Sequence, residues 1–116
     1  FGAFEGGPLE DYRRWAWATP PADDPPGGGE SRVAAALRVA SALETLLARP
    51  EQTVLAVGHA LPLRYALDAA VGRDPSARIT PVPHATAHPL ERDAVERAAS
   101  RLRAWADAPR FAPARG

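Results

Sequence analysis

A short apolar run that leads into a lone histidine constrains this chain more than any other feature of its sequence. Residues 53–57 (Thr-Val-Leu-Ala-Val) are apolar and rich in β-branched side chains, which is typical of a buried strand. Gly58 and His59 follow, and Pro62 suits the first turn of a helix, where its missing N–H costs nothing. The pattern predicts a strand–helix junction with His59 between the two elements.

The position of His59 supports two interpretations. At the carboxyl end of a strand in a parallel sheet, the free N–H groups of the next helix attract anions. A histidine at that point can donate hydrogen bonds to a phosphate or transfer a proton near neutral pH. In the second interpretation, His59 is a core histidine that hydrogen-bonds a neighbouring carbonyl. The junction alone does not separate the two.

Periodic patterns predict four helices around this junction. An N-cap at Ser31 opens the clearest one, and Gly72 should end the helix that follows His59. The predicted helices span residues 8–18, 30–48, 62–71 and 91–106. Their predicted inward positions include Val33, Leu37, Ala40, Leu43 and Leu47 in the second helix and Val95, Ala98, Leu102 and Trp105 in the last. Strands are expected at 53–58 and within 78–90, and a flexible loop at 19–29.

Composition excludes several classes of function. The formal net charge is zero and the pI is about 7.0, so nothing in the charge favours nucleic acid or acidic membranes as partners. The chain has no cysteine, which excludes disulfides and thiolate chemistry. No apolar run approaches the roughly 20 residues that span a bilayer. We expect a soluble, cytoplasmic protein, and the sequence leaves its oligomeric state open.

Three segments, taken in order, resemble the histidine phosphatase superfamily, which includes phosphoglycerate mutases and alpha-ribazole phosphatases. Residues 1–6 (FGAFEG) resemble the family's F-G-x-W-E-G segment. Residues 26–31 (PGGGES) are similar to its P-x-G-G-E-S turn. Residues 54–67 (VLAVGHALPLRYAL) resemble the element V-V-S-H-G-x-x-I-R-x-L, in which Arg64 matches the arginine. The ordered set is more specific than any one segment.

The resemblance implies an α/β fold, namely a three-layer α/β/α sandwich like that of phosphoglycerate mutase. The family's R-H-G motif belongs to the N-terminal part of its fold and does not occur in these 116 residues. We therefore expect the N-terminal part of the sheet to be missing. Residues 1–108 would then be a partial histidine phosphatase domain, and 109–116 a disordered tail. A missing strand is expected to expose a sheet edge and to favour association.

The resemblance also implies a mechanism. In the family, the R-H-G histidine attacks phosphorus and a second histidine stabilises the phosphoryl group in flight. By resemblance His59 is that second, catalytic histidine. The backbone N–H groups of Ala60 and Leu61 are expected to hold phosphate oxygens, with Arg64 and His84 as further substrate-binding residues. The expected function is phosphomonoester hydrolysis through a phosphohistidine, on a small phosphorylated substrate and with no cofactor; a mutase activity stays open.

Departures from the family pattern qualify this expectation. The nucleophilic histidine, the second phosphate-binding arginine and the acid/base glutamate all fall outside these residues, and Glu5 does not take the glutamate's role. We therefore expect the chain alone to be inactive. The alternative is a non-catalytic, degenerate domain that binds a phosphorylated ligand or a partner protein. An α/β-hydrolase fails on chemistry, because Ala60 would occupy the nucleophile position.

Several of these residues have competing structural roles. Arg64 either orients the phosphate site, or is a solvated helix residue, or pairs with Asp68. His84 either contacts the substrate or is a surface-loop residue. Glu30 either contacts the loop backbone or favours the N-terminus of its helix, and the helix role is preferred. His59, His84 and His88 have no spacing that favours a metal site.

Overall fold

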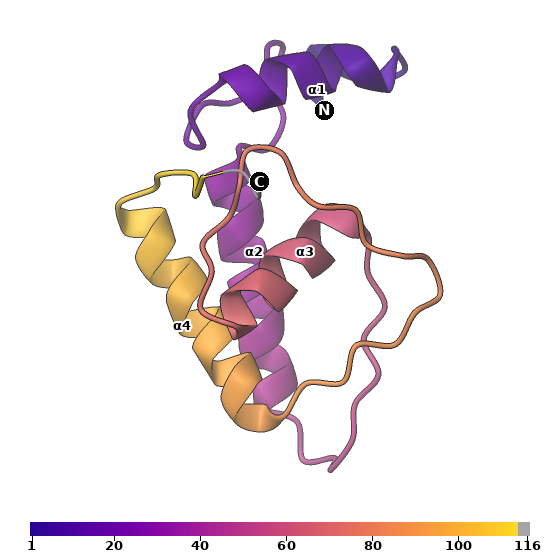
Figure 1. The fold of residues 1–116 in the computed structure, drawn as a ribbon, viewed down its shortest axis with the longest axis vertical. Coiled ribbons are helices and arrows are strands. Elements are labelled where there is room, and N and C mark those ends of the chain that lie inside the picture. Colours follow the sequence, from indigo (N-terminus) through magenta and orange to yellow (C-terminus); the bar gives the residue numbers. More distant parts are fainter. Residues whose placement is uncertain (114–116) are drawn as a thin grey trace.

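The described residues form a helical bundle, in which three helices pack together and another lies across one end (Figure 1). The structure is a computed structural model, and it describes residues 1–113. Helices α2, α3 and α4 enclose the core, and α2 makes its most extensive contact with α4. The elements are the 3-10 turn η1 (Gly2–Phe4) and the helices α1 (Leu9–Ala18), α2 (Arg32–Leu47), α3 (Ala60–Ala70) and α4 (Arg92–Asp107).

The expected three-layer α/β/α sandwich is wrong, because the described residues contain helices and no β-strand. Residues 53–58, predicted to be a buried strand, are irregular and exposed, with Leu55 87% and Val57 90% exposed. Strands are held by hydrogen bonds to neighbouring strands. Within residues 1–113 no hydrogen bond joins the backbone of 53–58 to another residue. High β-propensity without a partner strand therefore leaves this segment outside any sheet.

The second predicted strand region, residues 78–90, is also irregular. Its prolines at 81, 83 and 89 have no N–H to donate to a ladder. The β-type pairing seen in residues 1–113 is an isolated parallel bridge between Ser76 and Ala112. The helical predictions fared better, since all four helices are confirmed to within two residues at each end.

Helix α2 begins where the sequence predicts, and its buried face overlaps the predicted one, since Ala40 and Leu43 are buried. The Ser31 side chain accepts a hydrogen bond from the N–H of Ala34 at 3.0 Å and so caps the helix. The prediction was wrong at Leu37, which is 37% exposed, whereas Val39, which was not predicted to face inward, is buried. The buried residues of α2 are Arg32, Ala35, Ala36, Val39, Ala40 and Leu43. Alanines at the contact let the helix backbones approach closely, and this decides the face better than residue size does.

Helices α3 and α4 complete the core around a few large side chains. Leu102 and Trp105 of α4 are buried as predicted. The rings of Tyr65 in α3 and Trp105 meet edge to face, with their centroids 6.3 Å apart. Each such burial contributes about 1.5–3 kcal/mol. Between them lie fully buried alanines of all three helices, Ala36, Ala40, Ala69 and Ala98. The bundle is thus tightly packed at its centre, and it positions the start of α3 at its surface.

The side chain of Arg32 joins helix α1 to the bundle. The guanidinium of this buried arginine donates to the carbonyl oxygens of Ala16 at 2.8 Å and Thr19 at 2.9 Å. It lies between two rings, 4.9 Å from the centroid of Trp15 and 5.0 Å from that of Phe111. Burial lowers the pKa of this guanidinium from its usual value. Arg32 therefore connects α1, α2 and the C-terminal segment.

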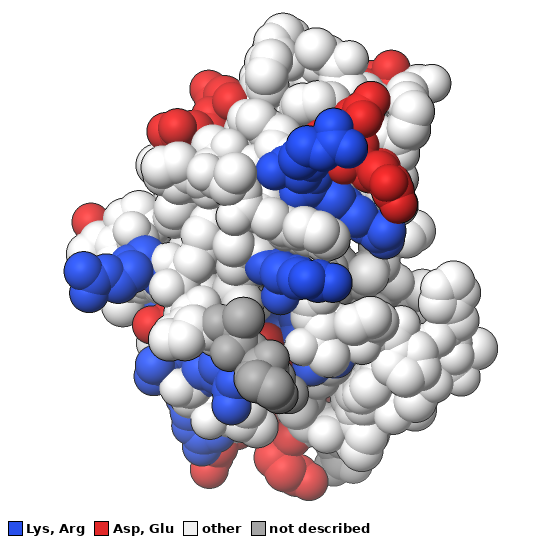
Figure 2. Space-filling model, turned by 45° about the horizontal axis from the view of Figure 1, so that its top comes forward, with Lys and Arg blue, Asp and Glu red and all other residues white. Residues whose placement is uncertain are grey.

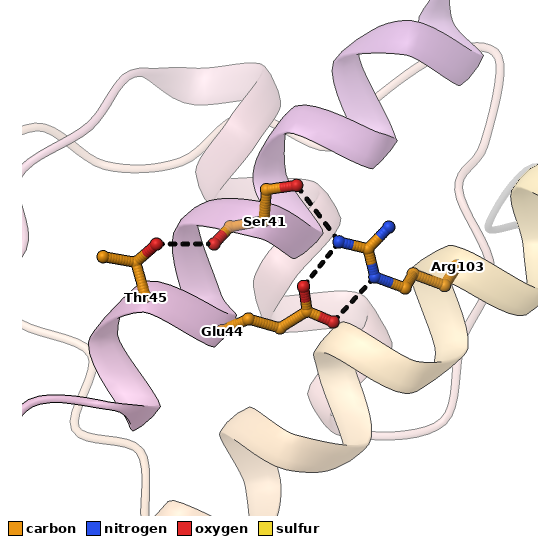
Figure 3. A network of polar contacts seen from close by, with 4 residues as sticks. All are labelled: Ser41, Glu44, Thr45 and Arg103. Atoms are coloured by element: carbon orange, nitrogen blue, oxygen red, sulfur yellow. Dashed lines mark hydrogen bonds and ion pairs between the residues drawn. The ribbon is translucent and has the colours of Figure 1, made fainter.

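A surface network ties α2 to α4 (Figure 3). Arg103 Nε donates to Glu44 Oε2 at 2.7 Å, and its Nη2 donates to the Ser41 hydroxyl at 3.1 Å. Thr45 donates to the Ser41 carbonyl one turn back. The hydrogen bond from Arg103 lowers the pKa of the Glu44 carboxyl. All these groups are solvent-exposed, so the network orients the two helices more than it stabilises them.

The segment after α4 folds back onto the bundle. Trp105 Nε1 donates to the carbonyl oxygen of Arg110 at 2.8 Å. The N–H of Ala112 donates to the carbonyl oxygen of Pro75, also at 2.8 Å. These contacts lie within the tail expected at 109–116, of which residues 114–116 lie outside the described part. None of the helices in residues 1–113 combines the length and apolar character that a bilayer-spanning segment requires.

Candidate functional site

His59 is the residue at which the irregular segment ends and α3 begins. It is the N-cap of α3, with φ −111° and ψ 175°, and the helix starts at Ala60, two residues before the predicted Pro62. The side chain of Leu63 packs against Gly58, and a Cβ atom added to Gly58 would lie 3.5 Å from it. The His59 side chain makes no capping hydrogen bond and is exposed. It is therefore accessible to a ligand at the helix N-terminus, and the alternative of a core histidine is not what the geometry favours.

Two backbone N–H groups at this helix start have no acceptor within residues 1–113. They belong to Ala60 and Leu61, the pair expected to hold phosphate oxygens. Pro62 has no N–H, and the N–H of Leu63 donates to the His59 carbonyl at 3.0 Å. The first turn of a helix carries a partial positive charge. Two free donors beside an exposed imidazole make a chemically suitable place for an anion.

Arg64 faces the segment that follows α3 rather than standing free in solution. Its Nε donates to the carbonyl oxygen of Thr80 at 3.0 Å, and its Nη2 to that of Pro81 at 3.1 Å. Its Nη1 lies 3.3 Å from Asp68 Oδ1, in the ion pair that the sequence suggested as one alternative. This guanidinium therefore holds residues 80–81 against α3, and a role in substrate binding stays a prediction.

The other two histidines lie on the exposed, irregular segment between α3 and α4. His84 and His88 are both solvent-exposed, and the His84 carbonyl accepts a hydrogen bond from the Thr86 hydroxyl at 3.1 Å. Across residues 1–113 no three His, Asp or Glu side chains gather in a group that would hold a metal ion. The substrate-binding role of His84 also stays a prediction.

The structure brings the first two family-like segments together. The N–H of Ala3 donates to the carbonyl oxygen of Pro26 at 2.6 Å. Gly2 has φ +61°, and a Cβ at that position would collide with the Gly28 carbonyl oxygen, so only glycine fits there. Gly2, Gly27 and Gly29 thus allow a close approach of the two backbones. This packing accounts for these three glycines without a ligand.

Two charged residues at the start of α2 have roles that the sequence did not reveal. Glu30 forms a two-bond ion pair with Arg38, at 2.9 and 3.0 Å, instead of contacting the loop backbone. Arg32 is buried and holds α1. A cation in the first turn of a helix opposes the helix dipole. That unfavourable position was the available signal that Arg32 has partners elsewhere in the fold.

A sizeable hollow of different character lies elsewhere on the surface of the described residues. A cleft of about 970 Å³ lies between the turn after α3 and the C-terminal half of α4, and it includes Arg73, Arg101 and Trp105. Arg101 is paired there with Asp74 at 2.9 Å. None of the residues around His59 lines it. Acidic and basic side chains lie close to one another on the face in Figure 2, in keeping with the zero net charge.

Comparison with known proteins agrees with the sequence resemblance. A model of the histidine phosphatase superfamily (branch 1) matches residues 1–108. The match covers all four helices and the three family-like segments, including His59. No curated protein and no solved structure matches the chain.

Proposed function

Because the chain belongs to the histidine phosphatase superfamily, we propose that it serves phosphomonoester hydrolysis through a phosphohistidine, with His59 as the histidine that stabilises the phosphoryl group. The observation that supports this role most directly is the position of His59 at the N-cap of α3. Its exposed imidazole stands beside the unpaired N–H groups of Ala60 and Leu61. The proposed substrate is a small phosphorylated molecule.

The chemistry of phosphoryl transfer fits such a site. In the transition state, negative charge is spread over the three equatorial oxygens of the phosphoryl group, and catalysis consists largely of positioning and stabilising that charge. Preorganised N–H donors do this without reorganising during the reaction. The imidazole of His59 and two backbone N–H groups provide three such donors from one helix start.

The proposal concerns the phosphoryl-binding part of the site. Arg-His-Gly, the motif that contains the family's nucleophile, does not occur in these 116 residues. His59 is therefore assigned to binding and charge stabilisation, and no other histidine of the chain is assigned the attack on phosphorus. This chain is expected to bind a phosphate analogue without turning over a phosphomonoester.

Calorimetric titration with orthovanadate tests the assignment. We expect vanadate to bind the wild-type chain and expect His59→Ala to weaken binding at least about tenfold, the loss of one charge-assisted donor. His88→Ala is the matched control, because it removes another exposed imidazole far along the chain from α3, and it should leave binding unchanged. Equal binding by the two variants would refute the role given to His59.

The missing motif supports a second candidate, a non-catalytic domain that binds a phosphorylated ligand or partner. Both candidates predict vanadate binding at His59. They differ in any form of the protein that contains Arg-His-Gly: only a phosphatase forms an acid-labile phosphohistidine there and hydrolyses p-nitrophenyl phosphate. Binding without either signal would favour the non-catalytic domain.

A further inference from the structure

The cleft beside the end of α3 has the size of a small-molecule site. Its volume is about 970 Å³, and it lies between residues 71–74 and the C-terminal half of α4. Residues 110–112 form a third side, where the N–H of Ala112 donates to the carbonyl oxygen of Pro75. In Figure 1 the chain that leaves α3 runs beside α4 toward this segment. Ligand sites in proteins are concave and have volumes of about 300–1,000 Å³.

The charged side chains of the cleft are mostly basic. Arg73, Arg101 and Arg110 line it together with one carboxylate, that of Asp74. Three guanidiniums against one carboxylate give the lining a formal charge of +2, whereas the whole chain is neutral. A concave surface with an excess of one sign attracts ions of the other sign. The cleft therefore favours an anion.

Two of these guanidiniums are available to a ligand. Those of Arg73 and Arg110 make no hydrogen bond or ion pair with another residue of the described part of the chain. Arg101 is partly engaged, because its Nε donates to Asp74 Oδ1 at 2.9 Å. A free guanidinium binds a carboxylate or a phosphate through two parallel hydrogen bonds.

Apolar side chains form the rest of the lining. Val71 is 74% exposed and so leaves an apolar surface in water. The half-buried ring of Phe111 lies 6.0 Å, between centroids, from the ring of Trp105. Free guanidiniums beside an apolar wall suit a ligand that combines an oxyanion with a flat ring.

We propose that this cleft binds a small aromatic dianion, with its oxyanion groups at Arg73 and Arg110 and its ring against Val71 and Phe111. Two carboxylates or a single phosphate supply the two negative charges that match the lining. None of the residues around His59 lines the cleft, so the proposal is independent of the phosphoryl site. An inorganic anion has no ring and gains nothing from the apolar wall, so vanadate and phosphate should prefer His59.

The indole N–H of Trp105 reports occupancy of the cleft, because it donates to the carbonyl oxygen of Arg110 in the cleft wall. Its NMR signal is assigned with Trp105→Phe and followed during titration with phthalate and with phenyl phosphate. Benzamidine, an aromatic cation, and inorganic phosphate are the controls. We expect both aromatic dianions to bind at least about tenfold more tightly than either control. The tighter of the two identifies the anionic group as carboxylate or phosphate, and equal binding of a control would overturn the proposal.

Two arginine variants test the contacts. Arg73→Gln and Arg110→Gln should each weaken phthalate binding at least about tenfold, the loss of one charge-assisted contact. Arg103→Gln is the matched control, because it removes an equal charge from α4 outside the cleft, where Arg103 pairs with Glu44. It should leave the affinity unchanged. His59→Ala should also leave it unchanged, which separates failure of this proposal from failure of the phosphoryl site.

Asp74→Asn should change the affinity in the opposite direction. It removes the carboxylate that repels an anion and releases Arg101 Nε, so phthalate should bind about threefold more tightly. A residue that only maintained the fold would not tighten binding when replaced, and circular dichroism checks that each variant keeps its helices. Weaker binding by Asp74→Asn, or unchanged binding by Arg73→Gln and Arg110→Gln, would overturn the proposal.

Discussion

Replacing Arg32 with alanine should detach α1 from the bundle. The guanidinium is buried and donates to the carbonyl oxygens of Ala16 and Thr19 at 2.8 and 2.9 Å, with Pro20 at 3.5 Å. Hydrogen bonds from a charged donor contribute about 1.5–3 kcal/mol each, and their loss leaves carbonyls unsatisfied. Part of this gain is offset by the desolvation of the buried charge. We expect the free energy of unfolding to fall by about 3–5 kcal/mol.

Amide hydrogen exchange separates local detachment from global destabilisation. In Arg32→Ala, the amides of α1 should lose protection first, while those of α2, α3 and α4 exchange only through the reduced global stability. Arg32→Met keeps an apolar side chain between the rings of Trp15 and Phe111 and removes the donors. It should restore part of the stability without restoring the protection of α1.

Arg38→Ala is the control on the same helix. Arg38 is exposed and pairs with Glu30 on the surface, so its loss should change the stability by less than about 1 kcal/mol. Urea unfolding followed by circular dichroism measures both variants. If Arg32→Ala changes stability no more than Arg38→Ala and leaves α1 protected, the account of Arg32 as the link to α1 is refuted.

Further outcomes are expected elsewhere in the bundle. Leu102→Ala should lower stability by about 2–5 kcal/mol in urea, because Leu102 is fully buried and its removal leaves a cavity. Ser31→Ala should cost about 1 kcal/mol in the same assay by removing the cap on Ala34, and Ser31→Asp should not. Arg103 lowers the pKa of Glu44, so their pair stabilises above the ordinary glutamate pKa and this contribution is lost as pH falls through the lowered folded-state pKa. In an NMR titration, Arg103→Gln should move the Glu44 midpoint upward, and an unchanged midpoint would contradict the contact.

Local signals in the sequence predicted the helices well. The cap at Ser31 and the glycine at 72, which has φ +82°, mark helix ends by short-range physics that needs no tertiary contact. Periodicity likewise predicted the burial of Leu102 and Trp105. These features depend on neighbours within one or two turns, and the sequence contains all of them.

The strand predictions failed because strands depend on partners that are distant in the sequence. Residues 53–58 have strand composition, but a strand exists only through hydrogen bonds to another segment. The described residues supply no such partner, so composition alone misled. In α2 the prediction was right for Ala40 and Leu43 and wrong for Leu37, because helix packing buried Val39 and alanines in place of the larger Leu37.

The candidate site was partly accessible from sequence. The position of His59 at the start of α3 followed from the junction of an apolar run, Gly58 and a first-turn proline. The contacts of Arg64 with residues 80–81 did not, because they join positions sixteen and seventeen residues apart. These contacts depend on how the irregular segment after α3 packs back against that helix.

The most direct measurement is a structure of the chain with bound orthovanadate or phosphate. The account predicts that the anion lies at the N-terminus of α3, with its oxygens about 3 Å from the nitrogens of Ala60 and Leu61 and from the His59 imidazole. An anion bound instead in the cleft beside Arg73 and Arg101, with His59 uninvolved, would contradict the central claim.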